Sequence, residues 1–471
     1  MSAGSDGGTG SDGPDSPDVS DSPDVGSPGG TATVAPGHEA VFAEHPPKRR
    51  TLAWAMWDWG SAAFNAVITT FVFATYLTDV VAENGAPAGA LSGTAWLGRT
   101  TAAAGVFIAL LAPVLGQRAD AGGRRKASLG LWTALTVLAM CAMFLVKDDR
   151  SYLWLGLLLL ALGNIFMEIG AVSYNAMLQQ VSTPKTVGRV SGFGWALGYV
   201  GGIFLLLILF VGLISPEVGW FGVTSEEGLR YRVVALVAAV WFALSAIPLF
   251  IFVPEVPRRP DAPKVGFVQS YRVLFRDVLE LWRNDRNAVF FLGASALFRD
   301  GLAAVFTFGA VLAVTVYGLS TSDVLIFGVA ANVVAAIGAF AGGQLEDRLG
   351  PKTIIVVSLI GLMATAIALL FVYSTAVFWV LGLILCLWVG PAQSSSRSFL
   401  AQVSPPGREG QMFGLYATTG RAVSFLSPAL LAVFAQFGGD RLGILGIVIV
   451  LGLGLAALLL VHSPARGKAR L

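Results

Sequence analysis

The sequence predicts an all-α membrane protein with twelve transmembrane helices in two six-helix bundles. Hydrophobic residues make up 55% of the 471-residue chain and charged residues 13%, against roughly 25% charged in an ordinary soluble domain. Twelve apolar segments are close to the ~20 residues that a membrane-spanning helix needs. A short pattern of glycine, acid and basic residues also occurs once in each half of the chain, which indicates two related halves.

The predicted spans follow a polar N-terminal segment. Residues 1–47 consist largely of Gly, Ser, Asp and Pro, and such a segment cannot bury enough apolar surface to offset the entropy of ordering, so we expect a disordered tail. The first residues lack a basic start followed by an apolar core, so no cleavable signal peptide is predicted. The spans then run approximately over residues 52–82, 94–115, 127–146, 151–178, 188–214, 231–253, 288–316, 324–344, 353–373, 376–399, 411–435 and 443–462.

The repeated pattern lies between the second and third span of each half. It reads GQRADAGGRRK at residues 116–126 and GQLEDRLGPK at residues 343–352. We expect the glycine to end one helix, the acid to cap the next, and the basic residues to occupy a tight turn on one membrane face. The residues expected to act as gating or conformational positions are Gly116, Asp120, Arg124, Gly343, Asp347 and Arg348.

Basic residues predict the orientation. With the N-terminus inside, most Lys and Arg residues outside the spans fall on the cytoplasmic side, so both termini are expected in the cytoplasm. The connection between the halves has apolar residues at helical spacing, and an amphipathic helix on the inner leaflet and a solvated linker helix fit it equally well. The expected domains are the tail 1–47, the bundles 48–254 and 288–462, the linker 255–287 and a short basic tail 463–471.

Several classes of function find no support in the sequence. Both cysteines lie in apolar runs and the three histidines lie outside the spans or at their ends, so neither a metal site nor a cofactor is expected. No basic patch with interleaved aromatic residues suggests nucleic-acid binding. The chain also lacks a nucleotide-binding loop and a cluster of nucleophile and base, which argues against an ATP-driven pump and against an enzyme.

Polar side chains inside the first half mark the candidate site. An ionisable group in lipid costs several kcal/mol unless it faces a partner or a water-filled cavity. Two spans each carry polar residues spaced four or seven positions apart, and this spacing keeps the residues of each span on one helical face. They are Asp58, Asn65, Thr69 and Tyr76 on the first span, and Asn164, Glu168 and Asn175 on the fourth. A cavity lining and a buried structural hydrogen-bond network are the two interpretations.

The spans of the second half carry basic groups. Arg299 and Asp300 are adjacent in the seventh span and roughly 100° apart around the helix, so one is expected to bond a neighbouring helix and the other to face the cavity. Arg421, in the eleventh span, is a natural partner for an acid. Gln393 and Arg397 are four residues apart on the tenth span, where Arg397 is close enough to the inner surface to snorkel. The alternative is that such charge pairs only hold helices together.

Several motifs resemble known transporter families. The repeated pattern is similar to the loop signature of the major facilitator superfamily, although Ala121 stands where that signature usually has Arg. A narrower resemblance, from Trp54 to about Pro428, is to the vacuole-effluxer-like transporters, which are related to the autophagy-associated vacuolar amino-acid effluxer of fungi. The motifs are WAMWDWGSAAF (54–64), YNAML (174–178), GRVSGFGWALGYVGG (188–202), RDG (299–301), QSSSRS (393–398), PPGRE (405–409) and FGLYATTGR (413–421).

The resemblance implies a major facilitator fold whose two halves rock about a site at mid-membrane. This chain has Arg299 where the family often has Asn, and Arg421 where it has Lys, which implies a different ligand or pairing scheme. A zwitterionic solute suits the charges: Arg299 or Arg421 could bind a carboxylate, and Asp58 or Asp300 an ammonium group. Fungal relatives imply amino-acid export from the vacuole.

The sequence therefore predicts a secondary active transporter of a small, polar, amino-acid-like solute, with proton-coupled efflux as one mode. Glu168 is the candidate H+ carrier, because a carboxyl in a poorly solvated site is protonated more readily. The substrate-binding candidates are Asp58, Asn65, Asn164, Asn175, Arg299, Asp300, Gln393 and Arg421. An exporter of drug-like or sugar substrates and a non-transporting receptor or scaffold are the alternatives. Few Lys beside many Arg, Ala and Gly residues favours a bacterial cell membrane, and a monomer is expected.

Overall fold

The computed structural model describes residues 46–256, except 86 and 88, and residues 266–463. Within these residues, twelve helical stretches are long and apolar enough to cross a membrane. The first half contains α1 (Lys48–Ala62), continued by η1 (Ala63–Phe71), α2 (Phe73–Tyr76) and η2 (Leu77–Val81), then α3 (Gly93–Gly122), α4 (Arg125–Ala142), α5 (Leu153–Ala176), α6 (Val187–Leu209) and α7 (Leu229–Phe252). After α8 (Phe267–Asn284), the second half contains α9 (Arg286–Thr315), α10 (Thr321–Leu349), α11 (Pro351–Leu370), α12 (Thr375–Val403), α13 (Glu409–Val423), α14 (Leu426–Gly438) and α15 (Asp440–Leu459).

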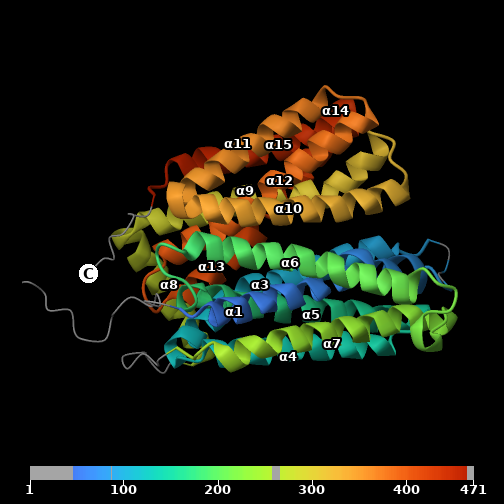
Figure 1. Cartoon of the computed structure of the whole chain (residues 1–471), viewed down its shortest axis with the longest axis horizontal. Helices are drawn as coiled ribbons and strands as arrows, with labels where there is room; N and C mark the ends of the chain where they lie inside the picture. Colours follow the sequence, from blue (N-terminus) through green and yellow to red (C-terminus); the bar gives the residue numbers. More distant parts are fainter. Residues whose placement is uncertain (1–45, 86, 88, 257–265, 464–471) are drawn as a thin grey trace, which may run out of the picture. The chain divides into compact units, whose positions relative to one another are not determined.

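The helices form two six-helix bundles, as predicted. In the first half α4 packs against α5 and α7, and in the second half α9 packs against α13 and α15. The halves meet along two long helix pairs, α6 with α10 and α3 with α13. Figure 1 shows α6 and α10 running side by side. The exact bundle boundaries stay a prediction, and the two predicted tails lie almost wholly outside the described residues.

The first span is not a regular α-helix, and this overturns part of the predicted polar stripe. Its middle, Ala63–Phe71, is π-helical, and the wider turns rotate the residues that follow away from a 3.6-residue register. Tyr76 consequently points into the first half, where its hydroxyl donates to the Val146 carbonyl at 3.2 Å and its ring stacks on Tyr231. The expectation that Asp58 and Tyr76 share one face is therefore wrong.

The repeated pattern also has a different local structure from the one expected. Gly116 does not end a helix: α3 continues to Gly122 and stops at Gly123, whose φ of 58° is left-handed. A Cβ on Gly116 would overlap the backbone of Gly410 in α13 and lie 2.6 Å from its carbonyl carbon. Gly343 likewise lies inside α10, which ends before Gly350 at φ 88°. Both pattern glycines allow close contact between the halves rather than a turn.

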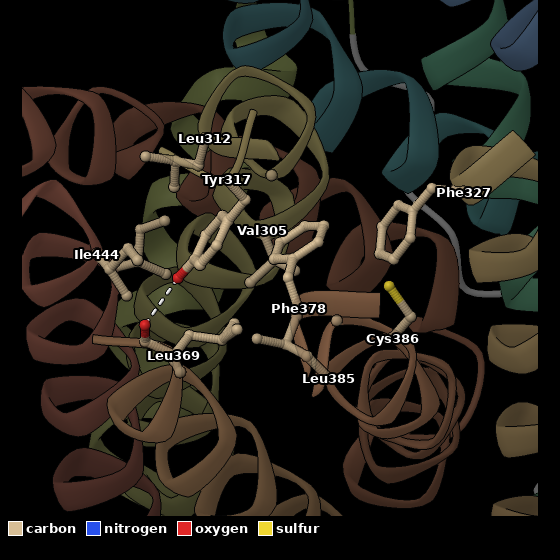
Figure 2. Close-up of a pocket in the computed structure, with 13 residues that line it drawn as sticks. Val305, Leu312, Tyr317, Phe327, Leu369, Phe378, Leu385, Cys386 and Ile444 are labelled. Carbon is tan, nitrogen blue, oxygen red and sulfur yellow. Dashed lines mark hydrogen bonds between the residues drawn. The ribbon is translucent and has the colours of Figure 1, made fainter. Parts of the chain in front are cut away.

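An apolar cavity of about 60 Å³ lies inside the second half (Figure 2). Its lining is almost wholly apolar and includes Val305, Gly309 and Phe378.

We expect Gly309→Ala to stabilise the protein. A Cβ there meets no heavy atom within 4 Å, and Ala in a helix interior is more favourable than Gly by roughly 0.5–1 kcal/mol. The matched change Gly338→Ala should destabilise by about 1–3 kcal/mol, because its Cβ would overlap the Leu387 carbonyl of α12. Melting temperatures of the two purified variants check this, and equal shifts in the same direction would contradict it.

Candidate functional site

The end of the spans predicted to face the cytoplasm, called the inner end below, is closed by a buried charge cluster between α3, α4 and α13. Arg125 is 1% exposed, and its Nε lies 2.6 Å from Asp120 Oδ1. Its Nη2 forms a second ion pair with Glu409, which is fully buried in the other half. Asp120 Oδ2 also accepts the backbone N–H of Gln411 at 2.9 Å. The acid of the first repeat therefore caps α13 of the other half, and the prediction that it caps α4 is wrong.

The second repeat makes the corresponding contact in the opposite direction. Asp347 Oδ1 accepts the backbone N–H groups of Gly188 at 3.1 Å and Arg189 at 3.3 Å. These groups belong to the first turn of α6, where a carboxylate satisfies free N–H donors and opposes the positive end of the helix dipole. Each repeat thus uses its acid to hold the N-terminus of a span in the opposite half.

Arg397 crosses between the halves slightly deeper in the membrane. Its Nη1 lies 3.0 Å from Asp58 Oδ2 and 3.4 Å from Asn175 Oδ1. Its Nη2 and Nε donate to the carbonyl and hydroxyl of Ser191, and its guanidinium lies over the Trp54 ring. The side chain is 4% exposed, so the prediction that it snorkels to the inner surface is wrong. Three helices of the first half hold it instead.

Another ion pair between the halves lies near the middle of the spans. Arg421 of α13 donates from Nη2 to Glu168 Oε1 of α5 at 2.7 Å. The two side chains are 27% and 36% exposed, whereas the groups of the inner cluster are almost fully buried. Arg421 was expected to pair with an acid, and its partner is Glu168. This pair is therefore a partly accessible pair of opposite charges near mid-membrane depth.

The adjacent charges of the seventh span bond two different residues, and both partners belong to the eleventh span. Arg299 Nη1 donates to the Tyr416 carbonyl at 3.0 Å and its guanidinium lies 3.6 Å from the centre of the Tyr416 ring. Asp300 accepts the backbone N–H of Ser427 at 2.7 Å and is buried. Because Ser427 lies in the first turn of α14, Asp300 caps this helix.

The predicted site residues thus form several contacts rather than one cluster. Asp58 and Asn175 meet at Arg397, Glu168 meets Arg421, and Asp300 is held at α14. Gln393 accepts a hydrogen bond from Tyr199 of α6 at 2.5 Å, again across the two halves. Asn65 is exposed and Asn164 half-buried. Of the expected gating residues, Arg124 is exposed while its neighbour Arg125 is the buried cation.

The two halves are tied together at the inner end, whereas α14, at the outer end, packs mainly within its own half. The pairs of Arg125, Asp347 and Arg397 all lie at or near the inner end. In contrast, α14, the outer half of the eleventh span, packs on α9 and α15 of its own half. These contacts close the inner end, and the Glu168–Arg421 pair lies above the closed region.

Sequence reasoning missed several residues at the inner end. Glu409 ends the PPGRE motif and Gln411 lies just after it, but neither they nor Glu346 were among the predicted site residues. Glu346 is buried and accepts hydrogen bonds from the hydroxyls of Ser395 and Ser398 on α12. Acids at the ends of apolar segments were the available signal, but such positions are usually solvated, and the sequence does not show that the other half covers them.

Comparison with known proteins is consistent with this geometry. Residues 179–470 match the family described as vacuole effluxer Atg22-like. The chain belongs to this family. It is 28% identical over 414 residues to the uncharacterized MFS-type transporter YxiO of Bacillus subtilis (strain 168), covering 86% of this chain and 93% of that protein. Autophagy-related protein 22-1 of Aspergillus fumigatus is 26% identical over 310 residues, which cover 60% of this chain and 49% of the fungal protein.

Solved structures confirm the fold of this Atg22-like protein. The proton:xylose symporter XylE superposes with a TM-score of 0.68 at 14% identity, covering 88% of this chain and 96% of that one. The transporter FucP in an outward conformation gives a TM-score of 0.63 at 14% identity, covering 88% and 98%. The predicted family and the major facilitator fold are thus confirmed, and both are those of multi-pass membrane transporters of small molecules rather than of enzymes.

Proposed function

We propose that this Atg22-like protein exports a small zwitterionic, amino-acid-like solute and binds it at the Glu168–Arg421 pair. The observation that carries this proposal is the position of the pair. Its two charges come from opposite halves, lie 2.7 Å apart and remain partly exposed above a closed inner end. A site made by both halves responds directly when the halves rock.

The chemistry of the pair suits a zwitterion. The Arg421 guanidinium can bind a carboxylate through two parallel hydrogen bonds, and the Glu168 carboxylate can accept from an ammonium group. The solute then replaces each member of the ion pair with a group of the same charge, so neither side chain is left unpaired in a poorly solvated site. Arg299, whose Nη1 lies 3.2 Å from the position of a Cβ on Gly420, the residue before Arg421, is a second candidate to donate hydrogen bonds to the carboxylate.

Competition at Glu168 offers a route to proton coupling. The carboxylate cannot hold a proton and accept an ammonium group as an ion pair at the same time. Proton binding from the outer side therefore favours solute release, and solute binding from the inner side favours proton release. Such exchange is efflux driven by inward proton flow. Positive-inside topology supports cytoplasmic termini, and we place the activity in a bacterial cell membrane.

The contacts in the structure change the roles proposed for the other candidates. Asp58 and Asn175 hold Arg397 and are assigned to closing the inner end, and Asp300 is assigned to capping α14. Asn65, Asn164 and Gln393 remain candidates for lining the pathway. The binding role therefore concentrates on Glu168 and Arg421, with Arg299 beside them.

The test is transport by purified protein in liposomes, after a melting-temperature screen against amino acids, sugars and small cations to choose the solute. We expect Glu168→Gln to retain solute exchange down a gradient and to lose uphill movement on a proton gradient. The control is Lys147→Gln, which removes an exposed charge from the pair with Glu227 and should transport normally. Uphill, proton-driven movement by Glu168→Gln would reject the assignment. Stabilisation by sugars but by no amino acid would reject the solute class.

A further inference from the structure

The connecting helix α8 is docked on the protein through polar groups. Asp277, 7% exposed, accepts hydrogen bonds from Gln117 Nε2 at 3.2 Å and Gln411 Nε2 at 3.4 Å. Tyr271 donates to the Leu110 carbonyl at 3.1 Å. Gln117 belongs to the first half and Gln411 to the second, so α8 touches both halves at the inner end.

A second face of α8 is apolar and uncovered by the described residues. Val268 is 77% exposed and Phe275 67% exposed, and their neighbours on this face are also open. At ~100° per residue these side chains fall within an arc of about 120°. The exposed apolar face consists of Phe267, Val268, Phe275, Leu279 and Trp282. A solvated linker helix would place polar residues here.

A row of arginines borders this apolar face on one side. Just beyond one edge of the apolar arc lie Arg272, Arg276 and Arg283, within roughly 40° of one another around the helix. All three are exposed. Arg276 makes one long contact with Asp277 at 3.9 Å. No ion pair of Arg272 or Arg283 occurs in the part of the chain that the structure describes. The row is therefore available to an anion outside the protein.

The apolar face continues onto a membrane span. The Trp282 ring lies 5.7 Å from that of Phe290, and Phe290 is an exposed residue near the start of α9. An exposed side chain on a span contacts lipid, so Phe290 faces the bilayer. Its neighbour Trp282 therefore lies at the depth where the lipid-facing surface of α9 starts. A soluble acidic protein could pair with the arginines, but it would not explain why an apolar face of α8 lies next to the bilayer.

We propose that α8 is a binding site for anionic phospholipid on the inner leaflet. The apolar face inserts between acyl chains beneath the headgroups, and Arg272, Arg276 and Arg283 bind the phosphate groups. An amphipathic helix with aromatic residues on one face and basic residues beside it has the composition for this position. The occupant is a lipid headgroup with its chains, not free phosphate.

The same helix links lipid binding to closure of the inner end. Asp277 faces Gln117 and Gln411, and Gln411 also donates its backbone N–H to Asp120. Lipid that fixes α8 in place therefore stabilises the arrangement in which α3 and α13 are held together. Anionic lipid is an effector that favours the closed-inside state.

The test compares the full-length protein in nanodiscs of phosphatidylcholine with increasing phosphatidylglycerol. We expect phosphatidylglycerol to raise the melting temperature of the wild type. Each arginine near an anionic surface contributes roughly a fivefold gain in affinity, so Arg272→Gln with Arg283→Gln should weaken the phosphatidylglycerol response about thirtyfold. The charge-matched control is Lys48→Gln with Lys185→Gln, two exposed residues away from α8, which should respond within about twofold of wild type.

Two further measurements distinguish a lipid site from a site for free phosphate, and lipid binding from its effect on closure of the inner end. Soluble glycerol phosphate at the same concentration should give no shift. Amide hydrogen exchange at residues 409–416 should slow in phosphatidylglycerol, and Asp277→Ala should abolish this slowing while keeping the melting response. Equal responses of the two double variants, a shift with glycerol phosphate, or no response of the wild type would overturn the lipid site. If amide exchange still slowed in Asp277→Ala, the proposed link between lipid binding and closure of the inner end would be overturned.

Discussion

Replacing Arg125 with Met is expected to open the inner end. The change leaves Asp120 and Glu409 buried without their shared cation, and removing one member of a buried charge cluster costs about 3–5 kcal/mol. All three groups lie where the two halves meet, so the cost falls on the closed-inside state. A distance between spin labels at Lys185 and Leu349, in a variant lacking Cys141 and Cys386, should lengthen by several Å.

A charge-neutral triple variant tests the physical reason for that opening. Asp120→Asn, Arg125→Met and Glu409→Gln together remove the buried charges as well as their partner, and the closed distance should return in most molecules. Lys147→Met serves as the exposed control. Its pair with Glu227 is 39% and 63% exposed, and such pairs contribute about 0–1 kcal/mol. A triple variant as open as Arg125→Met alone would show that Arg125 acts through its shape rather than its charge.

Replacing Gly192 with Leu should produce the second large effect, through steric exclusion. A Cβ at this position would overlap the Ala339 carbonyl oxygen and lie 2.9 Å from Gly343 Cα. Both obstacles are backbone atoms of α10, so only separation of α6 from α10 relieves the clash. Overpacking costs about 1–3 kcal/mol, which shifts the population away from the closed-inside state by about 5- to 150-fold.

The matched control for this change is Gly293→Leu in α9. A Cβ on Gly293 meets no heavy atom within 4 Å, so the larger side chain has space and the inner distance should stay as in the wild type. The same pair of spin labels measures both variants. If Gly192→Leu kept the wild-type distance, the close approach of α6 and α10 at the inner end would be incorrect.

Much of the fold could be predicted from the sequence because membrane insertion is a local property. An apolar segment of about 20 residues spans the bilayer wherever it occurs in the chain, so the number of spans followed from hydropathy. The two copies of the glycine, acid and basic pattern, at residues 116–126 and 343–352, predicted the two halves. The ionisable residues inside spans were also visible, since each is costly in lipid, and they include both members of the Glu168–Arg421 pair.

The partners of those residues could not be predicted from spacing along a helix. The spacing of Asp58 and Tyr76 predicts one face of an α-helix, but the π-helical stretch Ala63–Phe71 rotates Tyr76 away from the face that carries Asp58. Asp120 has the spacing of a cap for the following helix, but the close contact of Gly116 with Gly410 carries it to α13 of the other half. A small change in helical register or one glycine contact is enough to choose a different partner.

The sequence by itself determined that this protein has twelve spans in two related halves, and which of its charges lie within the bilayer. Only the tertiary structure decided that Arg397 closes on Asp58, that Arg125 joins Asp120 to Glu409, and that Glu168 and Arg421 remain accessible between the halves. The physical reason is range: hydropathy acts over one helix, whereas charge pairing depends on the packing of residues some 250 to 340 positions apart.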